Sequence, residues 1–291
     1  MPTLSILAAE LLKVRKRWIP YILLLPVVAA LAFQTFLAYF IGWRNGGDVE
    51  ALYVAVLPWS LPALLDMTQF LGAIMIGILA ASMTGTEEGW GTVRQALVRG
   101  QSRSAYLTTK LLGIAVVAVI GVLVVMGIGL LFSIIITVVE GSPITLDVPG
   151  GDDLSVVDVA LMGLRTVYTM TPYVLLAFCL TVVGRSTTLG VAGVLVYVML
   201  EAIVLAILGG IGGEAADART YFIGHNVMAI LVENQVSHLG YFSMAARGSL
   251  VLRADLPDPG VAALVLALYC AVFLTIAYVV FNRRDLGASA G

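Results

Sequence analysis

The sequence predicts an all-α integral membrane protein, folded as one domain over residues 1–291 with six transmembrane helices. Hydrophobic residues make up 60% of the chain and charged residues 12%, with a mean hydropathy of +1.02, whereas soluble domains carry about 25% charged residues. A transmembrane helix needs about 20 mostly apolar residues, because lipid cannot pair its backbone polar groups. The stretches that qualify are 18–41, 61–83, 111–138, 159–183, 188–208 and 260–281.

The distribution of lysine and arginine predicts the orientation, because these residues are retained on the cytoplasmic side. With the N-terminus inside, the cytoplasmic segments contain 11 of the 16 basic residues, namely Lys13, Arg15, Lys16, Arg17, Arg94, Arg99, Arg103, Lys110, Arg185, Arg283 and Arg284. Most acidic residues fall on the other side. We therefore expect a multi-pass protein with both termini in the cytoplasm. The net charge of −2 argues against a nucleic-acid partner, which would need a basic face.

Two segments outside the spans have helical patterns of their own. Residues 3–16 place apolar side chains at helical spacing and basic ones near the first span, which predicts a helix in the membrane interface; a helical tail in the cytosol is the alternative. Residues 209–259, before the last span, form a long extracytoplasmic segment with an apolar but interrupted middle. For it we expect a re-entrant or surface-lying helical pair, with an ordinary loop as the alternative.

The residues that common membrane enzymes need do not occur at the required spacings. Arg94 lies two positions too far from Glu87 and Glu88 for a Glu-Glu-x-x-x-Arg intramembrane protease, and His225 and His238 lack the spacing of a zinc site. No histidine lies near the serines of the cytosolic segments, so a serine nucleophile would lack its base, and no lysine follows a glycine as a P-loop requires. We predict no catalytic residue, no metal site and no bound cofactor.

The polar segment 84–110 between the second and third predicted spans contains "TEEGWGTVRQALV". Thr86 is a candidate N-cap, and the order of acids before arginines suits a helix dipole, so the sequence predicts a short helix that begins there. Trp90, Val93 and Leu97 form one apolar stripe that we expect to lie against a partner or the bilayer. Polar contacts would come from Glu87, Glu88, Arg94 and Gln95. A solvated loop that only anchors the topology remains the alternative.

The same segment resembles a known family. Its matching residues are Glu88, Gly91, Thr92, Arg94, Leu97, Gly100, Ser102, Arg103 and Lys110. This run is similar to the E…GT…L…P.SR…K signature of type-2 ATP-binding-cassette (ABC) permeases, the membrane subunits of bacterial exporters, although Gly100 stands where the family usually has proline. The likeness extends to a Glu-x-x-Lys in the N-terminal helix (Glu10, Lys13), six spans, and the closing residues Phe281 to Asp285.

The resemblance implies a function and partners. Residues 84–110 would contain the cytosolic coupling helix that docks into a separate ABC ATPase subunit, present in two copies and carrying the ATP and magnesium. A second permease chain would complete a homodimer in the inner (cytoplasmic) membrane of the cell. Residues implied in coupling are Glu87, Glu88, Trp90, Gly91, Thr92, Arg94, Leu97 and Arg103.

Charges inside the predicted spans are a further candidate site, because they are costly in lipid. They are Asp66, Arg165 and Glu201. Glu201 would suit a cationic substrate in the pathway, but a Glu201–Arg165 pair or a neutral carboxyl is the preferred interpretation. In the second span Ala73, Gly77 and Ala81 lie four apart, which fits a dimer contact or packing within one chain.

Three function classes follow from these patterns. The first is the permease subunit of an ATP-driven exporter. The second is a secondary transporter or channel that acts alone, which would be expected to show broken spans or paired repeats. A membrane-embedded enzyme is third, because it would lack a nucleophile and metal ligands.

Overall fold

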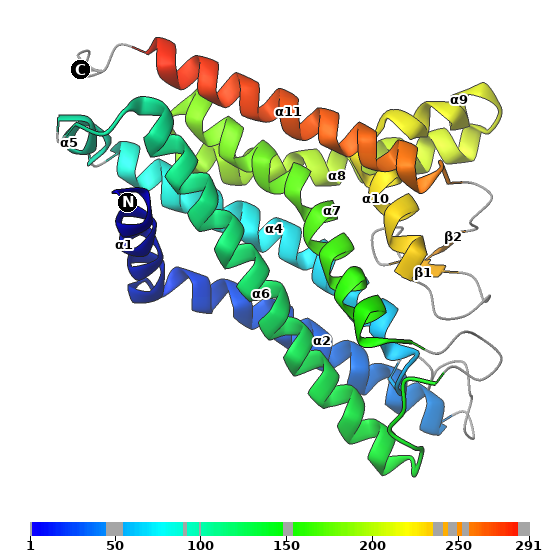
Figure 1. The fold of residues 1–291 in the computed structure, drawn as a ribbon. Coiled ribbons are helices and arrows are strands. Elements are labelled where there is room, and N and C mark those ends of the chain that lie inside the picture. The colour runs from blue at the N-terminus through cyan, green and yellow to red at the C-terminus, as the bar shows by residue number, and fades with distance from the viewer. Residues whose placement is uncertain are drawn as a thin grey trace.

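The computed structural model describes residues 2–44, 55–89, 92–98, 100–147, 154–234, 241–243, 249–251 and 256–284. Its long helices are α2 (Ile19–Arg44), α4 (Ser60–Gly89), α6 (Arg103–Val139), α7 (Val156–Gly184), α8 (Thr187–Ile211) and α11 (Pro259–Arg283) (Figure 1). These six helices are long and apolar enough to cross a membrane. The prediction of an all-α, multi-pass integral membrane protein is confirmed.

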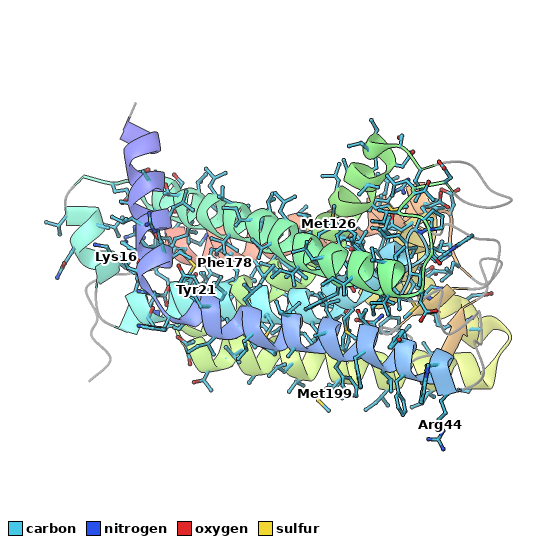
Figure 2. The ribbon with its side chains drawn as sticks, turned by 90° about the horizontal axis from the view of Figure 1, so that it is seen from below. Lys16, Tyr21, Arg44, Met126, Phe178 and Met199 are labelled. Carbon is cyan, nitrogen blue, oxygen red and sulfur yellow. The ribbon has the colours of Figure 1, made fainter. Side chains whose placement is uncertain are left out.

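Two helices, α4 and α7, form the centre of the bundle. Both are mostly buried, whereas α2, α6, α8 and α11 turn most of their apolar side chains outward. Phe178 of α7 is fully buried, and Met199 of α8 is 66% exposed and points away from the bundle (Figure 2). Lipid tails are as apolar as these side chains, so this distribution suits a bilayer.

The stripe of small residues in α4 packs within the chain. A Cβ atom at Gly77 would lie 3.4 Å from Ala177 Cβ of α7 and 3.7 Å from Val194 Cγ1 of α8. Ala73 and Ala81 are buried as well. Of the two interpretations of this stripe, the structure therefore supports packing against α7 and α8.

One end of the bundle, which we name the α5 end, gathers three segments. The N-terminal helix α1 (Pro2–Lys16) lies across the end of the bundle at a steep angle to α2 (Figure 1, Figure 2). The short helix α5 (Thr92–Val98) and the C-terminal end of α11 lie at the same end (Figure 1). The helix expected over residues 3–16 is present; that it lies in the membrane interface, and that this end faces the cytoplasm, stay predictions.

The opposite end, the α10 end, holds short elements. They are α9 (Glu214–Asp217), η1 (Ala218–Tyr221), α10 (Ile223–Leu231), η2 (Val232–Asn234) and an antiparallel hairpin of β1 (Tyr241–Ser243) and β2 (Ser249–Val251). Every residue of α10 is buried, and the helix packs on α11 and α7. Helical elements are thus present within 209–259, and α10 is buried rather than surface-lying; that this segment re-enters the membrane stays a prediction.

The helix expected to begin at Thr86 does not begin there. Instead α4 continues to Gly89, and the Thr86 hydroxyl donates to Ser82 O at 2.6 Å, as threonine does inside a helix. The preceding helix does not end at Met83, so there are no free N–H groups for Thr86 to cap. The sequence prediction placed this boundary two turns too early.

Close packing of α8 on α4 and α7 can be tested at Gly190. A Cβ atom there would meet the Thr181 hydroxyl and lie 2.8 Å from Ala177 O and 2.9 Å from Ala81 Cβ. We expect Gly190→Ala to lower the free energy of unfolding by about 1–3 kcal/mol through overpacking, read as a lower Tm in detergent. Gly127→Ala is the control, because nothing lies within 4 Å of its Cβ position. Equal Tm values for the two variants would contradict this packing.

Candidate functional site

A buried ammonium group joins three helices at the α5 end. Lys110, in the second turn of α6, is 1% exposed. Its Nζ lies 2.7 Å from Glu10 Oε2 of α1 and 2.6 Å from Glu87 Oε1 of α4. Buried opposite charges this close offset one another's loss of water, and losing either partner is costly. Lys110 therefore fixes α1, α4 and α6 relative to one another.

Two further side chains complete this group, which we name the Lys110 cluster: Glu10, Lys13, Glu87, Tyr106 and Lys110. Lys13 Nζ lies 2.7 Å from Glu10 Oε1 and 3.2 Å from Glu87 Oε1, and the Tyr106 hydroxyl donates to Glu87 Oε2 at 2.7 Å. Burial alone would lower the pKa of Lys13, but its hydrogen bond to Glu10 and the charges of both glutamates outweigh burial and raise that pKa. With two carboxylates and two ammonium groups, the cluster is balanced in charge.

Two arginines hold the end of α11 against the same corner. Arg284 Nη1 lies 3.5 Å from Glu88 Oε1, and Arg284 Nη2 donates to Val183 O at 2.6 Å. Arg103 Nη1 donates to Asn282 O at 2.6 Å and to Arg284 O at 2.7 Å. Because a guanidinium group offers several donors in a fixed plane, these contacts join the ends of α4, α6, α7 and α11.

The short helix α5 packs one face on the bundle and exposes the other. Val93 is 5% exposed and lies in a core cluster with Met83, against which Leu97 is packed. Gln95 and Val98 face outward, and Val98 is 80% exposed. Within this chain Val93 therefore covers the protein's own core, and the half-buried Leu97 packs against the same cluster. That the Trp90, Val93 and Leu97 stripe contacts a partner or the bilayer stays a prediction, and Trp90 lies outside the described residues. The outer face of α5, with Gln95 and Val98, is the surface left for a partner.

Both glutamates of the polar segment form ion pairs within the chain. Glu87 is 5% exposed and belongs to the Lys110 cluster, and Glu88 pairs with Arg284. Trp90 and Gly91 lie outside the described residues, and of Thr92 and Arg94 only the backbone, within α5, is described. Among the predicted coupling residues, the structure brings Glu87, Glu88, Leu97 and Arg103 to one corner.

Sequence reasoning missed that Lys110 is buried and that it pairs with Glu10. The two residues are 100 positions apart, so no local pattern connects them. A signal was present, however, because Lys110 directly precedes an apolar run and Glu87 follows another. Charges at the ends of two consecutive spans lie at the same depth, where they can pair.

The charges within the spans do not pair as expected. Arg165 donates to Glu233 O at 3.0 Å and to Asn234 Oδ1 at 3.2 Å. Glu201 accepts hydrogen bonds from two tyrosines and from a backbone N–H of α10. The predicted Glu201–Arg165 pair is therefore wrong, because each residue is satisfied by nearer groups. Asp66 is buried near the start of α4, in a different part of the bundle from the Lys110 cluster.

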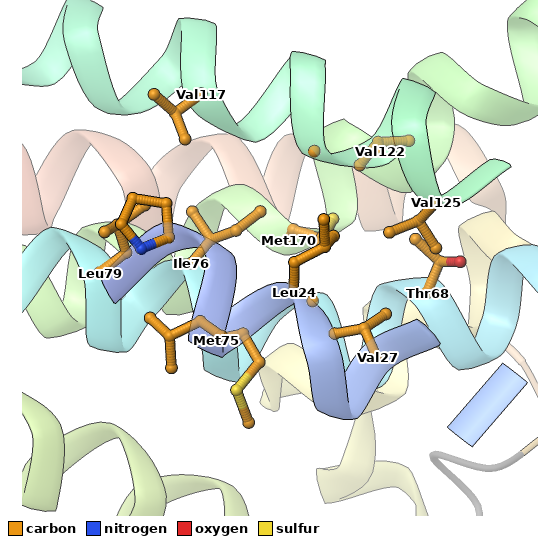
Figure 3. A pocket seen from close by; sticks show the side chains of 14 residues that line it. Leu24, Val27, Thr68, Met75, Ile76, Leu79, Val117, Val122, Val125 and Met170 are labelled. Atoms are coloured by element: carbon orange, nitrogen blue, oxygen red, sulfur yellow. The ribbon is translucent and has the colours of Figure 1, made fainter. Parts of the chain in front are cut away.

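A pocket lies between α2, α4, α6 and α7 (Figure 3). Its lining includes Leu24, Val27, Met75, Val125 and Met170, and no charged residue lines it. Its one hydroxyl, that of Thr68, donates to the backbone. The pocket can therefore receive only apolar groups, and we assign it no chemistry.

The fold and the α5-end site together define a multi-pass α-helical membrane protein with a short helix fixed between two spans. Residues 23–287 match the model of a family described as a protein of unknown function, DUF2705, and the chain belongs to this family. A comparison with curated proteins found no match.

The importance of the buried charge can be measured with two lysine variants. Lys110→Met removes the buried one of the two ammonium groups that pair with Glu10 and Glu87 and leaves only the half-exposed Lys13, and we expect it to lower the free energy of unfolding by about 3–5 kcal/mol. Lys13→Met is the matched control, because the Lys13 side chain is 49% exposed and its loss should cost less than about 1 kcal/mol. Thermal unfolding of the detergent-purified variants checks this. Similar Tm values for both would contradict the account.

Proposed function

We propose that the chain is the transmembrane permease subunit of an ATP-driven exporter of the type-2 ABC class. It would form the translocation pathway and contact a separate ABC ATPase subunit through α5. The observation that carries the proposal is the position of α5: this short helix lies between α4 and α6, beside the Lys110 cluster, with Gln95 and Val98 on its outer face.

The packing at this corner supports a mechanical role. The inner face of α5 contacts the same core cluster as Val182 of α7 and Phe281 of α11, and the Lys110 cluster ties α4 to α6 and α1. Close-packed interiors have low compressibility and transmit strain. A displacement of α5 by a partner would therefore move α4 and α6 together, and α4 in turn contacts α7 and α8.

The distribution of basic residues supports the cytoplasmic placement of this end. Lys13, Arg103, Lys110 and Arg284 all lie in the joined corner of the α5 end, and such residues are retained in the cytoplasm. An ATPase in the cytosol could then reach α5. In this proposal the protein lies in the cell (inner) membrane with both termini inside.

In the proposed assembly, ATP hydrolysis and the translocation pathway belong to different chains. Two ATPase subunits would bind ATP and magnesium, and this chain would hydrolyse nothing itself. A second copy of the permease would complete the pathway as a homodimer within the bilayer. The outward apolar side chains of α2 and α8 leave surface for lipid and for that second copy.

A stand-alone secondary transporter or channel is the second candidate. The observation that favours it is Glu201, a carboxylate buried within a span, because such residues mark ion pathways in transporters. Uptake or efflux by the purified chain in liposomes, without any ATPase, would support this candidate over the first.

Co-expression tests the proposed ATPase contact. The tagged chain is produced with ABC ATPase subunits of the same organism, and the ATPase retained on purification is quantified with its hydrolysis rate. Val98→Asp places a charge on the proposed contact face, and we expect at least a tenfold loss of bound ATPase, because unpaired charge at an interface opposes binding.

Val156→Asp is the matched control. Val156 is 78% exposed, close to the 80% of Val98, but it begins α7 at the opposite end. ATPase retention should be unchanged in this variant. The proposal fails if no ATPase is retained by the wild-type chain, or if both variants lose it equally.

A further inference from the structure

Glu201 lines a recess between α4, α8 and α10. It lies ten residues before the end of α8, and is 5% exposed. The recess walls carry Gln69 and Phe70 of α4, Tyr173 of α7, and Met228 of α10, with aliphatic side chains between them. At about 1.5 Å per residue, this recess lies roughly 15 Å from the end of α8, inside the span.

The carboxylate is held in place by donors from three elements. Oε1 accepts from the Tyr197 hydroxyl at 3.0 Å and from Gly224 N at 2.9 Å, and Oε2 accepts from the Tyr173 hydroxyl at 2.9 Å. Glu201 thus caps α10, whose own N-cap residue Phe222 makes no side-chain cap. The same carboxyl group also lines the recess, where a bound cation could approach it.

No protein cation balances this carboxylate in the part of the chain that the structure describes. The nearest candidate by sequence reasoning, Arg165, is bound to η2, and none of the ion pairs among the described residues involves Glu201. Negative charge inside a span is costly. A cation that brings its own charge into the recess would offset this cost and favour the ionised form of Glu201.

Three neighbouring side chains, Gln69, Phe70 and Tyr173, suit a cation bound in the recess. Gln69 is 2% exposed and lines the recess, and its amide makes no hydrogen bond with the described residues. Phe70 and Tyr173 present aromatic rings on the recess walls, and aromatic faces attract ammonium groups. Ile74, Val198 and Leu205 would cover apolar groups attached to the cation.

We propose that this recess binds the ammonium group of an organic cation. The carboxylate, the uncommitted amide and the aromatic walls hold the charged head, while the aliphatic walls receive its apolar flank. This step rests on the proposed permease function, under which the substrates would be apolar amines or quaternary ammonium compounds. Binding itself needs only this chain, so it is testable without the ATPase.

Equilibrium dialysis of the full-length, detergent-purified chain with radiolabelled benzyltrimethylammonium tests the site. We expect saturable binding that Glu201→Gln weakens at least tenfold, because glutamine keeps an acceptor for α10 but loses the charge. Phe70→Leu should weaken binding about threefold or more, because it removes a ring but keeps apolar bulk. Neopentylbenzene, the uncharged carbon analogue of the probe, should not displace the bound cation.

Glu140→Gln is the control, because Glu140 is an exposed acid at the end of α6. It should bind the probe as the wild-type chain does. The proposal is overturned if the wild-type chain shows no saturable binding, or if folded Glu201→Gln binds equally well, which would leave Glu201 as a structural cap of α10. If Glu201→Gln does not fold, unchanged binding by Phe70→Leu overturns the proposal. Loss of ATPase retention with intact probe binding would instead refute only the permease function.

Discussion

The buried Lys110 ammonium is the interaction on which the α5 end depends. It is paired at 2.7 Å and 2.6 Å with carboxylates from two other helices. Helix propensity is a local property, so it cannot place α1 across the end of the bundle or α5 between α4 and α6. Membrane helices lack a hydrophobic force between them, so apolar packing alone does not fix their relative positions. At the α5 end the buried, charge-balanced Lys110 cluster fixes them.

From this corner, α4 connects the two sites of the molecule. Glu87 lies in its last turn at the α5 end, and Gln69 lines the recess toward the α10 end. The 18 positions between them (87 − 69) span about 27 Å at 1.5 Å per residue. Because α4 packs on α7 and α8 along this length, a rigid movement at one end reaches the other. In our proposal, this is how a partner at α5 would change the recess around Glu201.

The sequence predicted the spans well, because hydropathy over about 20 residues depends only on local composition. It also predicted the helix over 3–16 and a helical element within 209–259. The sequence did not predict contacts between segments that are distant along the chain. Periodicity showed that Val93 and Leu97 share an apolar face, but not that this face packs on the protein's own core. The partners of Glu201 and Lys110 come from distant segments, which a single sequence does not connect.

Photo-cross-linking in living cells tests the central claim most directly. A benzophenone amino acid is placed at Gln95, on the outer face of α5, and in a parallel strain at Val157, which is 66% exposed at the opposite end. Irradiation followed by mass spectrometry identifies the protein attached at each position. The account predicts an ABC ATPase subunit attached at position 95 and none at position 157. An ATPase attached at 157, or none at 95 when the ATPase is present, would contradict it.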